Sequence, residues 1–496
     1  MITINDMSLA FAGQVLFENV TININSKDKI GLVGRNGAGK STLFKLINQE
    51  LSVDSGAISL PKNYSIGTVK QHLSFTKDMV LEEACLGLRP ENQWDEWKVE
   101  KLLLGLGFTE DDFYRSPQEF SGGFQIRLNL VKVLASEPDM LLLDEPTNYL
   151  DIGSVRWLQS FLKNWPGELV LISHDRGFMD SITNHTIAIH RQKLRKIKGS
   201  TIDLYAKIAE DEEIYEKTRL NQEKKDKKTQ AFIDTFRSKA NMAKLVQSRI
   251  KALNRSEKLE KLQDIKQLDF AFNDAPFHGK VHMRAKKLYF KYKADGPDIV
   301  RHFSVDVDKT DRICIIGKNG IGKSTLLKLL YGQLKPDQGD ITTHPATEIG
   351  YFGQTNIDTL NPYNTIEEEL VTCTGNGDRE KIRKICGTMM FSGDLALKKI
   401  EVISGGEKSR VLLGKILLTP ANLLMLDEPT HHLDMESCDT LVEAIKQFKG
   451  AAIIVTHNES FLHLLATKLI VFTKNGPSLF LGTYQDYLDK HGKDLS

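Results

Sequence analysis

Two glycine-rich stretches have the residue types and the spacing of phosphate-binding loops. In the first, Lys40 and Ser41 follow the apolar run 29–33 and precede a segment with apolar residues at helical spacing, which is the strand, loop and helix order of a P-loop. Glycines let backbone N–H groups turn toward phosphate oxygens, the Lys offers a charge to the outer phosphates, and the Ser offers a hydroxyl to a magnesium ion. The candidate phosphate-binding residues are Gly34, Arg35, Asn36, Gly37, Ala38, Gly39, Lys40, Ser41 and Thr42.

A second copy of this loop lies 283 positions later, because 323 − 40 = 283. Its candidate phosphate-binding residues are Gly317, Lys318, Asn319, Gly320, Ile321, Gly322, Lys323, Ser324 and Thr325. One such motif can arise by chance in a glycine-containing turn. Several chemically important positions recur at this one offset, so the sequence indicates two copies of one domain.

Two carboxylates end an apolar strand-like run in each copy. Asp144 and Glu145 follow the run 140–143, and Asp427 and Glu428 follow its repeat. We expect Asp144 and Asp427 to bind magnesium together with Ser41 and Ser324, and the two glutamates to polarise an attacking water. The alternative is that these carboxylates only cap the helix that follows.

His174 and His457 each follow a further apolar run, and we expect them to contact the γ-phosphate region. Gln71 and Gln354 each lie 31 residues after their P-loop Lys (71 − 40 = 31 and 354 − 323 = 31). An amide at that place can reach the magnesium or the attacking water. A purely structural His and a plain loop Gln are the alternatives.

A further Ser-Gly-Gly stretch precedes a helical segment in each copy. A hydroxyl and glycine amides at a helix N-terminus can bind an anion. Because a P-loop already serves the phosphates of its own copy, we expect this second anion site to serve the nucleotide of the other copy. The residues are Ser121, Gly122, Gly123, Ser404, Gly405 and Gly406.

The motifs, in this order, resemble those of an ATP-binding-cassette ATPase. The stretches 121–123 and 404–410 resemble its signature sequences, and 145–151 and 428–434 resemble its Walker B and D-loop segments. Two such cassettes on one chain, joined by a charged helical linker, resemble the ABC-F subfamily. The resemblance implies that the chain binds ATP and Mg²⁺ and hydrolyses ATP. Because Glu145 and Glu428 are both present, we predict that both sites hydrolyse ATP.

The resemblance also implies that the cassettes close head to tail around two ATP molecules. Ser404 would complete the Lys40 site, and Ser121 would complete the Lys323 site. Phe11 and Tyr292 would stack on adenine, although they are 281 positions apart (292 − 11 = 281), so the repeat register slips there.

The two copies depart from one another at three places. Phe124 stands in the first signature where the second has Glu407. His431 replaces Asn148, and Asn458 replaces Asp175. These differences could make the two sites unequal in rate.

We predict an α/β fold with two tandem P-loop ABC ATPase domains, because apolar strand-like runs alternate with helical ones in each copy. The predicted boundaries are 1–200 for the first domain, 201–278 for an α-helical hairpin linker and 279–496 for the second domain.

The linker is basic. Residues 217–261 hold 14 Lys and Arg against 5 Asp and Glu, a net charge of +9, whereas the whole chain carries only +1. We expect the acidic run 210–213 to open the first helix, a tip near 238–243, and Val246, Ile250 and Leu253 to line the seam between two helices. Such a basic rod suits a nucleic-acid backbone, and a merely solvated helix face is the alternative.

By resemblance, the partner is the ribosome, met through its rRNA and the P-site tRNA near the exit site. The protein would regulate translation or rescue stalled ribosomes, and the short linker tip favours this role over antibiotic resistance by ribosome protection. Two competing interpretations are an ATPase subunit of a membrane transporter and a DNA-repair or chromosome-associated ATPase.

Five scattered cysteines without a CxxC pair, and an N-terminus without a signal-peptide pattern, lead us to expect a reduced, cytoplasmic protein. No apolar run approaches the roughly 20 residues of a membrane helix. We expect a monomer whose two cassettes pair within one chain.

Overall fold

The computed structural model describes residues 1–11, 14–69, 74–236, 242–255, 261, 270–293, 296–353, 359–374, 378–391, 393–431 and 433–492. The chain divides into two compact units. One unit holds Met1–Lys198, the first cassette, and Leu268–Ser496, the second cassette; the other is the linker, Gly199–Gln267.

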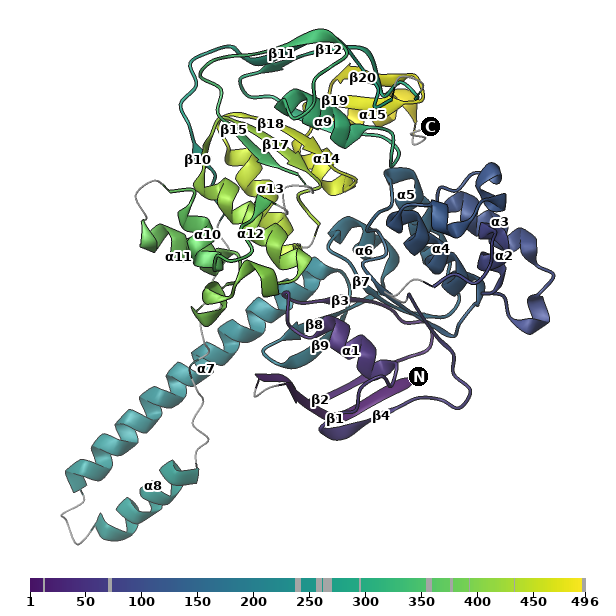
Figure 1. Ribbon diagram of the computed structural model, residues 1–496. Helices are drawn as coiled ribbons and strands as arrows, with labels where there is room; N and C mark the ends of the chain where they lie inside the picture. The colour runs from purple at the N-terminus through teal and green to yellow at the C-terminus, as the bar shows by residue number, and fades with distance from the viewer. Residues whose placement is uncertain are drawn as a thin grey trace. The chain divides into compact units, whose positions relative to one another are not determined.

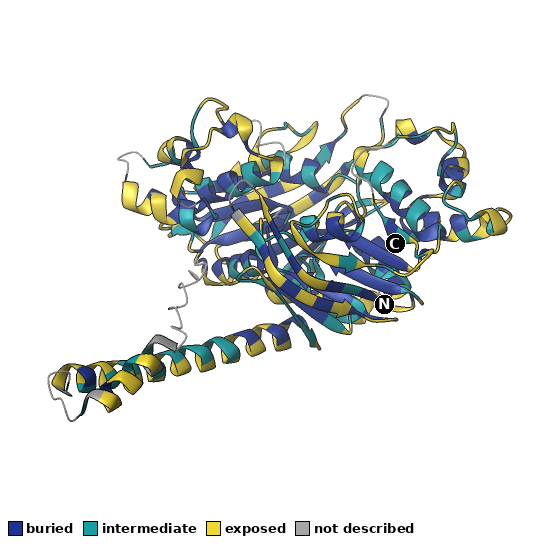
Figure 2. Ribbon diagram, turned by 90° about the horizontal axis from the view of Figure 1, so that it is seen from below, coloured by how far each residue is buried: buried dark blue, intermediate teal, exposed yellow. Residues whose placement is uncertain are grey.

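Each cassette is built on a six-stranded, mostly parallel sheet, which confirms the tandem α/β fold. In the first cassette the strand order is β5-β6-β7-β3-β8-β9, and only β9 runs antiparallel to its neighbour. Its central strands are apolar and buried on both faces, as Figure 2 shows in dark blue. The strands are β3 (Lys29–Val33), β5 (Ile66–Thr68), β6 (Met140–Asp144), β7 (Glu168–Ile172), β8 (His185–His190) and β9 (Lys193–Lys198).

A smaller antiparallel sheet and the P-loop helix share a core with the parallel sheet. This sheet has the order β2-β1-β4, with β1 at Ile2–Phe11, β2 at Gln14–Ile24 and β4 at Ser55–Ser59. The first of the helices, α1 (Lys40–Ile47), buries Leu43 and Leu46 in that core. The remaining helices are α2 (Val80–Cys85), α3 (Glu96–Gly105), α4 (Gly122–Ala135), α5 (Ile152–Lys163) and α6 (Arg176–Ile182).

The second cassette repeats this plan. Its antiparallel sheet is β12-β11-β14, with β11 at Val281–Phe290, β12 at Val300–Asp308 and β14 at Gln338–Thr343, and its parallel sheet is β15-β17-β18-β13-β19-β20. Those strands are β13 (Arg312–Ile316), β15 (Ile349–Phe352), β17 (Leu423–Asp427), β18 (Ala451–Val455), β19 (Lys468–Thr473) and β20 (Gly476–Leu481). The helices are α9 (Lys323–Tyr331), α10 (Ile366–Val371), α11 (Arg379–Thr388), α12 (Gly405–Leu418), α13 (Met435–Gln447), α14 (Glu459–Leu465) and α15 (Tyr484–His491).

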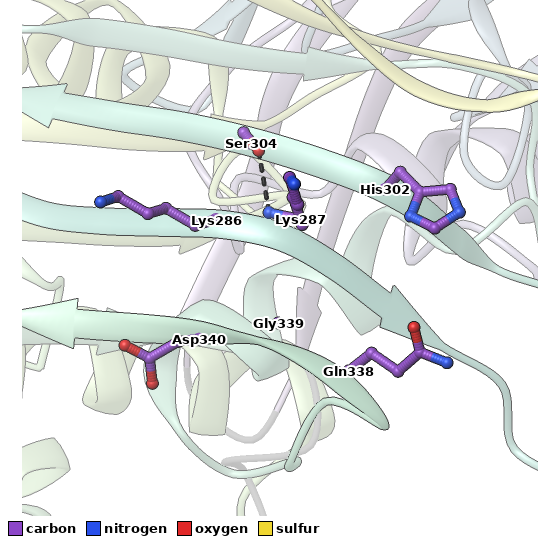
Figure 3. A pocket seen from close by; sticks show the side chains of 7 residues that line it. All are labelled: Lys286, Lys287, His302, Ser304, Gln338, Gly339 and Asp340. Atoms are coloured by element: carbon purple, nitrogen blue, oxygen red, sulfur yellow. Dashed lines mark hydrogen bonds between the residues drawn. The ribbon is translucent and has the colours of Figure 1, made fainter.

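A bulge in the antiparallel sheets locates the slip in the repeat register. The backbone N–H of Lys287 donates to Ser304 Oγ at 2.8 Å, beside a polar hollow lined by strands β11, β12 and β14 (Figure 3). In the first cassette the N–H of Asp6 donates to Thr21 Oγ1 at 3.0 Å, and both bulged residues have a left-handed backbone. Because 287 − 6 = 281 but 304 − 21 = 283, the slip lies between the paired strands. Phe11 and Tyr292 are therefore structurally equivalent.

The linker contains two helices, α7 (Thr201–Phe236) and α8 (Ala243–Arg255), with α8 lying beside the last turns of α7 (Figure 1). At 1.5 Å per residue, α7 is about 54 Å long. Ile233 and Val246 are buried, and the Arg249 guanidinium lies 5.7 Å from the centre of the Phe232 ring. The expected tip lies largely outside the described residues, at 237–241.

One expectation about the linker is wrong. The acidic run 210–213 does not open the first helix, which already begins at Thr201. Ser200 precedes that start, and its N–H and hydroxyl donate to the carboxylate of Asp203 in the first turn, at 2.9 and 2.7 Å, which caps the helix earlier than the charge pattern suggested. In the part of the chain that the structure describes, no helix is both long and apolar enough to cross a membrane.

Candidate functional site

The two P-loops fold as strand, loop and helix. Gly39 and Gly322 precede α1 and α9 with left-handed φ of 100° and 116°. A Cβ on Gly322 would come within 2.2 Å of Ile299 Cγ2, so both backbone conformation and space require glycine there. The backbone N–H groups of the loop can therefore point toward the space at the N-terminus of the helix, where anions are stabilised.

The P-loop lysines lie at the centre of these loops. Lys40 Nζ donates to the carbonyl oxygens of Gly34 at 2.7 Å and Arg35 at 3.3 Å. Lys323 makes the equivalent contacts with Gly317 and Lys318, at 3.0 and 2.9 Å. Burial lowers the pKa of both lysines, and nearby carboxylates oppose that shift. Each loop thus holds one cation at the place where phosphates are expected, half-buried in the first cassette and buried in the second.

The predicted magnesium ligands meet at the same place. Ser41 Oγ donates to Asp144 Oδ2 at 2.8 Å, and Asp427 accepts an equivalent bond from Ser324. Burial raises the pKa of both aspartates, and the serine bonds and the lysines oppose it. A hydroxyl and a carboxylate in contact suit a magnesium ion. Gln71 and Gln354 lie outside the described residues.

Each expected catalytic glutamate lies beside its histidine. Glu145 Oε2 accepts from the backbone N–H of His174 at 3.3 Å, and the ring Nε2 of His174 lies 3.3 Å from Glu145 Oε1. In the second cassette, His457 Nε2 is 3.6 Å from Glu428 Oε1. Both glutamates have φ of 50°, a strained backbone that aims the carboxylate away from its strand.

Three buried polar atoms at these centres have no hydrogen-bond partner among the residues that the structure describes. They are Glu145 Oε1, Glu428 Oε1 and His457 Nδ1. Burial raises the pKa of both glutamates and lowers that of His457. Such atoms destabilise a fold, so their presence fits a site that receives water and phosphate oxygens. The two centres also share a small cavity of about 50 Å³ between the cassettes.

The two signature sequences differ in structure. Ser404 caps α12 in a capping box, in which its hydroxyl lies 2.8 Å from Glu407 Oε2. Ser121 caps α4 without a side-chain bond, because Phe124 stands where Glu407 stands in the second copy. The Phe124 ring instead packs edge-on against Phe108, with centroids 5.2 Å apart. The Ser121 hydroxyl is therefore not held by a capping box.

Contacts cross between the P-loop of each cassette and the D-loop segment of the other. The Asn36 N–H donates to Asp434 Oδ2 at 3.1 Å. On the opposite side, Asn319 Nδ2 donates to the Tyr149 carbonyl at 2.6 Å. These contacts run head to tail. Completion of each nucleotide site by the opposite signature Ser stays a prediction.

In the ion pairs between the cassettes, the positive residue comes from the first cassette and the negative residue from the second. Arg35 pairs with Glu436 at 2.8 Å, and its Nε also donates to that carboxylate at 2.9 Å. Two further pairs join the cassettes, and among the described residues every ion pair between them has Arg on the first cassette and a carboxylate on the second. We call these the arginine seam: Arg35–Glu436, Arg156–Glu459 and Arg176–Asp439.

Sequence reasoning missed the seam and also missed Arg127. Arg127 is only 2% exposed, and it donates to the carbonyl oxygens of Leu106 and Tyr149. It therefore ties the signature helix α4 to the D-loop segment that contacts Asn319. A charged residue on the apolar face of a helix was the sequence signal that could have revealed it.

The expected adenine-stacking residues lie near the P-loops as exposed rings. Phe11, at the end of β1, is 46% exposed, and Tyr292 is 60% exposed. The Tyr292 hydroxyl lies 3.1 Å from Thr325 Oγ1 on α9. Part of each ring is therefore open to a base, and the stacking role stays a prediction.

Comparison with known families and sequences agrees with these motifs. A family model described as "ABC transporter" matches residues 17–148 and 300–431, and a second model with this description, an extension of the first, matches 187–272. The putative ATP-binding protein YdiF of Bacillus subtilis is 32% identical over 100% of this chain and 83% of its own length. The probable ATP-binding protein YheS of Escherichia coli K12 is 33% identical (98% and 81%), and rat ATP-binding cassette sub-family F member 3 is 31% identical (98% and 73%).

Solved structures share the tandem fold. The archaeal ribosome recycling factor aABCE1, in complex with the archaeal ribosomal stalk protein aP1, superposes with a TM-score of 0.65 at 18% identity, covering 98% of this chain and 92% of that one. A structure titled RNase-L Inhibitor gives the same TM-score and identity, covering 98% and 93%. At this identity the likeness concerns the fold alone.

Proposed function

The chain belongs to the F subfamily of ATP-binding-cassette proteins, and from that premise we propose that it is an ATP-hydrolysing protein that binds the ribosome and regulates translation or rescues stalled ribosomes. The single observation that carries the proposal is the basic helical linker between two complete sets of ATPase motifs. Its partners would be rRNA and the P-site tRNA, met by residues 217–261 of a cytoplasmic monomer.

The residues at each centre are suited to phosphoryl transfer to water. Lys40, Ser41 and Asp144 would hold the nucleotide phosphates and Mg²⁺ at the first site, and Lys323, Ser324 and Asp427 at the second. Bound magnesium supplies positive charge that neutralises the phosphates. The Glu145 carboxylate can orient a water and accept its proton. The backbone N–H of His174 donates to that carboxylate at 3.3 Å.

Contacts between the cassettes connect the two sites to the linker. The P-loop of each cassette touches the D-loop segment of the other through Asp434 and Tyr149. A change at either nucleotide therefore acts on the contact between cassettes. The linker joins β9, which ends at Lys198, to the second cassette, so a relative movement of the cassettes displaces its two ends.

The linker surface supports a nucleic-acid partner. Lys224, Lys225, Lys227 and Lys228 on α7 are all exposed. Binding of such cations to a phosphate backbone releases counterions and weakens with salt. Two structural neighbours are titled as a ribosome recycling factor and as a ribosome-bound model of archaeal Pelota and ABCE1. These titles agree with the proposal, which rests on the linker and the family.

Ribosome co-sedimentation tests the proposal. The variant with Glu145→Gln and Glu428→Gln should pellet with ribosomes in the presence of ATP and Mg²⁺, and much less with ADP, because it binds ATP without hydrolysing it. Lys40→Ala with Lys323→Ala is the matched variant that should not respond to ATP. Equal pelleting with ATP and ADP, or a stronger affinity for duplex DNA at the same salt, would contradict a ribosomal role.

A further inference from the structure

The first cassette has a pocket of about 970 Å³ whose lining contains none of the candidate nucleotide-binding residues. Its lining includes Lys27 before β3, Asp139 before β6 and Gly167 before β7. It therefore lies at the amino ends of the parallel strands, whereas the P-loop follows the carboxyl end of β3. No motif identified in the sequence falls in this pocket.

Aromatic side chains form one wall of the pocket. Trp157 stacks on Phe161 with ring centroids 5.3 Å apart, and Phe161 packs against Trp165 at 5.8 Å. Trp97 of α3 also lines the pocket and is 59% exposed. A wall of this kind can receive another aromatic ring.

The internal repeat identifies the matching place in the second cassette. The lining residues Ala135, Pro138 and Trp165 correspond to Leu418, Ala421 and Phe448, because each pair is separated by 283 positions. The two places have the same surroundings: the end of the signature helix, the start of the strand that leads to the catalytic glutamate, and the turn before the next strand.

In the second cassette, the chain itself fills this place. Residues Asn273–Asp274 form the short strand β10, which pairs in parallel with β16 (Pro420–Ala421). The Phe272 ring packs edge-on against Phe448, with centroids 5.6 Å apart, and Phe270 is only 4% exposed. The second cassette thus shows what kind of segment this place receives.

Polar contacts fix that segment. Asn273 Nδ2 donates to the Leu418 carbonyl at 3.0 Å, and the Ala275 N–H donates to the Ala421 carbonyl at 2.8 Å. Asp274 Oδ1 accepts from the Lys449 N–H at 3.3 Å. Carbonyl acceptors therefore carry much of the docking. Ala135 and Pro138 stand at the equivalent positions in the first cassette. There Glu137 has a left-handed backbone, Arg89 donates to the carbonyl oxygens of Ser136 and Glu137, and Pro138 has no N–H to donate.

We propose that the pocket of the first cassette binds an extended segment of a partner protein, which carries an aromatic residue followed by an acidic one. Its aromatic residue would lie against Trp165, as Phe272 lies against Phe448 in the second cassette. Main-chain bonds to the carbonyl oxygens of Ala135 and Pro138 would give affinity, and the aromatic wall would give specificity.

Charge at the pocket favours an acidic partner. The lining acids are engaged within the cassette: Glu137 pairs with Lys98 at 3.3 Å, and Glu168 accepts from Tyr64 Oη at 2.8 Å. Lys27 and Lys101 are exposed at the rim. These two cations supply the attraction for an acidic side chain of the partner.

A peptide of residues 268–277, added to the full-length protein, tests the proposal. Its residues 270–277 belong to the segment that the second cassette already holds, and it carries Phe270, Phe272, Asp274 and Phe277. Three of the four tryptophans line the pocket, so tryptophan fluorescence reports binding there. We expect a saturable change. A peptide with Phe270 and Phe272 replaced by Ser should bind at least tenfold more weakly.

Two exposed lining residues locate the site without disturbing the core. Trp97→Ala and Lys101→Glu should each weaken peptide binding by about three- to tenfold, while Trp94→Ala, outside the pocket lining, should not. Thermal unfolding confirms that the variants are folded. Binding that is insensitive to both pocket variants, an equal affinity for the Ser peptide, or no binding would overturn the proposal. A short single-stranded RNA that binds in place of the peptide, with the same dependence on Trp97 and Lys101, would overturn it too.

Discussion

Arg156 of the first cassette pairs with Glu459 of the second, and the internal repeat places opposite charges at the equivalent positions. The equivalents are Asp439 (156 + 283 = 439) and Arg176 (459 − 283 = 176), and these two residues form a second ion pair. The two pairs are copies of one contact, in which the first cassette always supplies the Arg. Two first cassettes would bring Arg against Arg, so the arginine seam favours unlike cassettes.

Reversing the charges on one side of the arginine seam should lower the ATPase rate, and exchanging the charges on both sides should restore it. Arg156→Glu with Arg176→Glu opposes like charges, and we expect the ATPase rate to fall about tenfold, since the two partly exposed pairs together contribute about 1.4 kcal/mol. Adding Asp439→Arg and Glu459→Arg rebuilds both pairs and should return most of the activity. Lys163→Glu, exposed on the same helix, is the control. A reversed variant as active as the wild type would contradict the role of the seam.

Mixing two defective variants provides a second prediction. One carries Arg156→Glu and Arg176→Glu, and the other carries Asp439→Arg and Glu459→Arg. Each has like charges within its own chain, but the first cassette of one complements the second cassette of the other. The mixture should therefore regain ATPase activity and form dimers in size-exclusion chromatography coupled to light scattering. Activity that stays at the sum of the separate variants would show that the seam does not select partners.

Stability should depend on pH through the buried glutamates. Burial raises the pKa of Glu145 and Glu428 above the ordinary value, so ionising them costs more in the folded protein than in the unfolded chain. Protonation of the two glutamates in the folded protein contributes stability that is fully present below their pKa in the unfolded chain. This contribution is lost as the pH rises through their pKa in the folded protein. Replacing both by Gln should raise Tm by a few degrees at pH 8, with a difference that shrinks near pH 5.

Thermal unfolding of the wild type and the double Gln variant across this pH range measures the effect. Glu82→Gln, on the exposed side of α2, is the control and should give no comparable gain. A double Gln variant that is less stable than the wild type at pH 8 would show that the glutamates are not held at a cost to the fold.

The two signature serines should differ in their contribution to helix stability. Ser404→Ala removes the capping box with Glu407 and should destabilise the first turn of α12 by about 1 kcal/mol. Ser121→Ala should destabilise the first turn of α4 by only a few tenths of about 1 kcal/mol, because Ser121 makes no side-chain capping bond to α4. Hydrogen exchange should show about fivefold faster exchange in the first turn of α12 and little change in α4. Equal effects in both helices would contradict this difference.

The sequence predicted the centre of each site because strand ends fix it. Ser41 and Asp144 meet at 2.8 Å, and His174 lies beside Glu145, since each residue follows a buried parallel strand of one sheet. The arginine seam could not be predicted this way, because its partners come from different cassettes and their contact depends on docking. The exchange of charge between Arg156 and Asp439 at the repeat offset was nevertheless present in the sequence.

The start of the first linker helix was predicted wrongly for a different reason. We placed it at residues 210–213 because acidic side chains suit a helix N-terminus, but dipole effects of this kind are worth only about 0.3–1 kcal/mol. The Ser200–Asp203 cap and the continuous run of helix-forming residues after it outweigh that preference, so α7 begins at Thr201. Cap residues were the better indicator of this boundary.

A cross-link from the linker tests whether ATP controls the binding of the linker to ribosomal RNA. A photoactivatable side chain at Lys228, exposed on α7, is placed in the variant with Glu145→Gln and Glu428→Gln, and the protein is irradiated with purified ribosomes. We predict cross-links from Lys228 to rRNA or tRNA in the presence of ATP and Mg²⁺, and few in the presence of ADP. The same photoactivatable group at Lys62, which is exposed on the first cassette, should give few cross-links with ATP or with ADP. Cross-links that are absent with ATP, or equal at Lys228 and Lys62, would contradict the account of an ATP-controlled linker that binds ribosomal RNA.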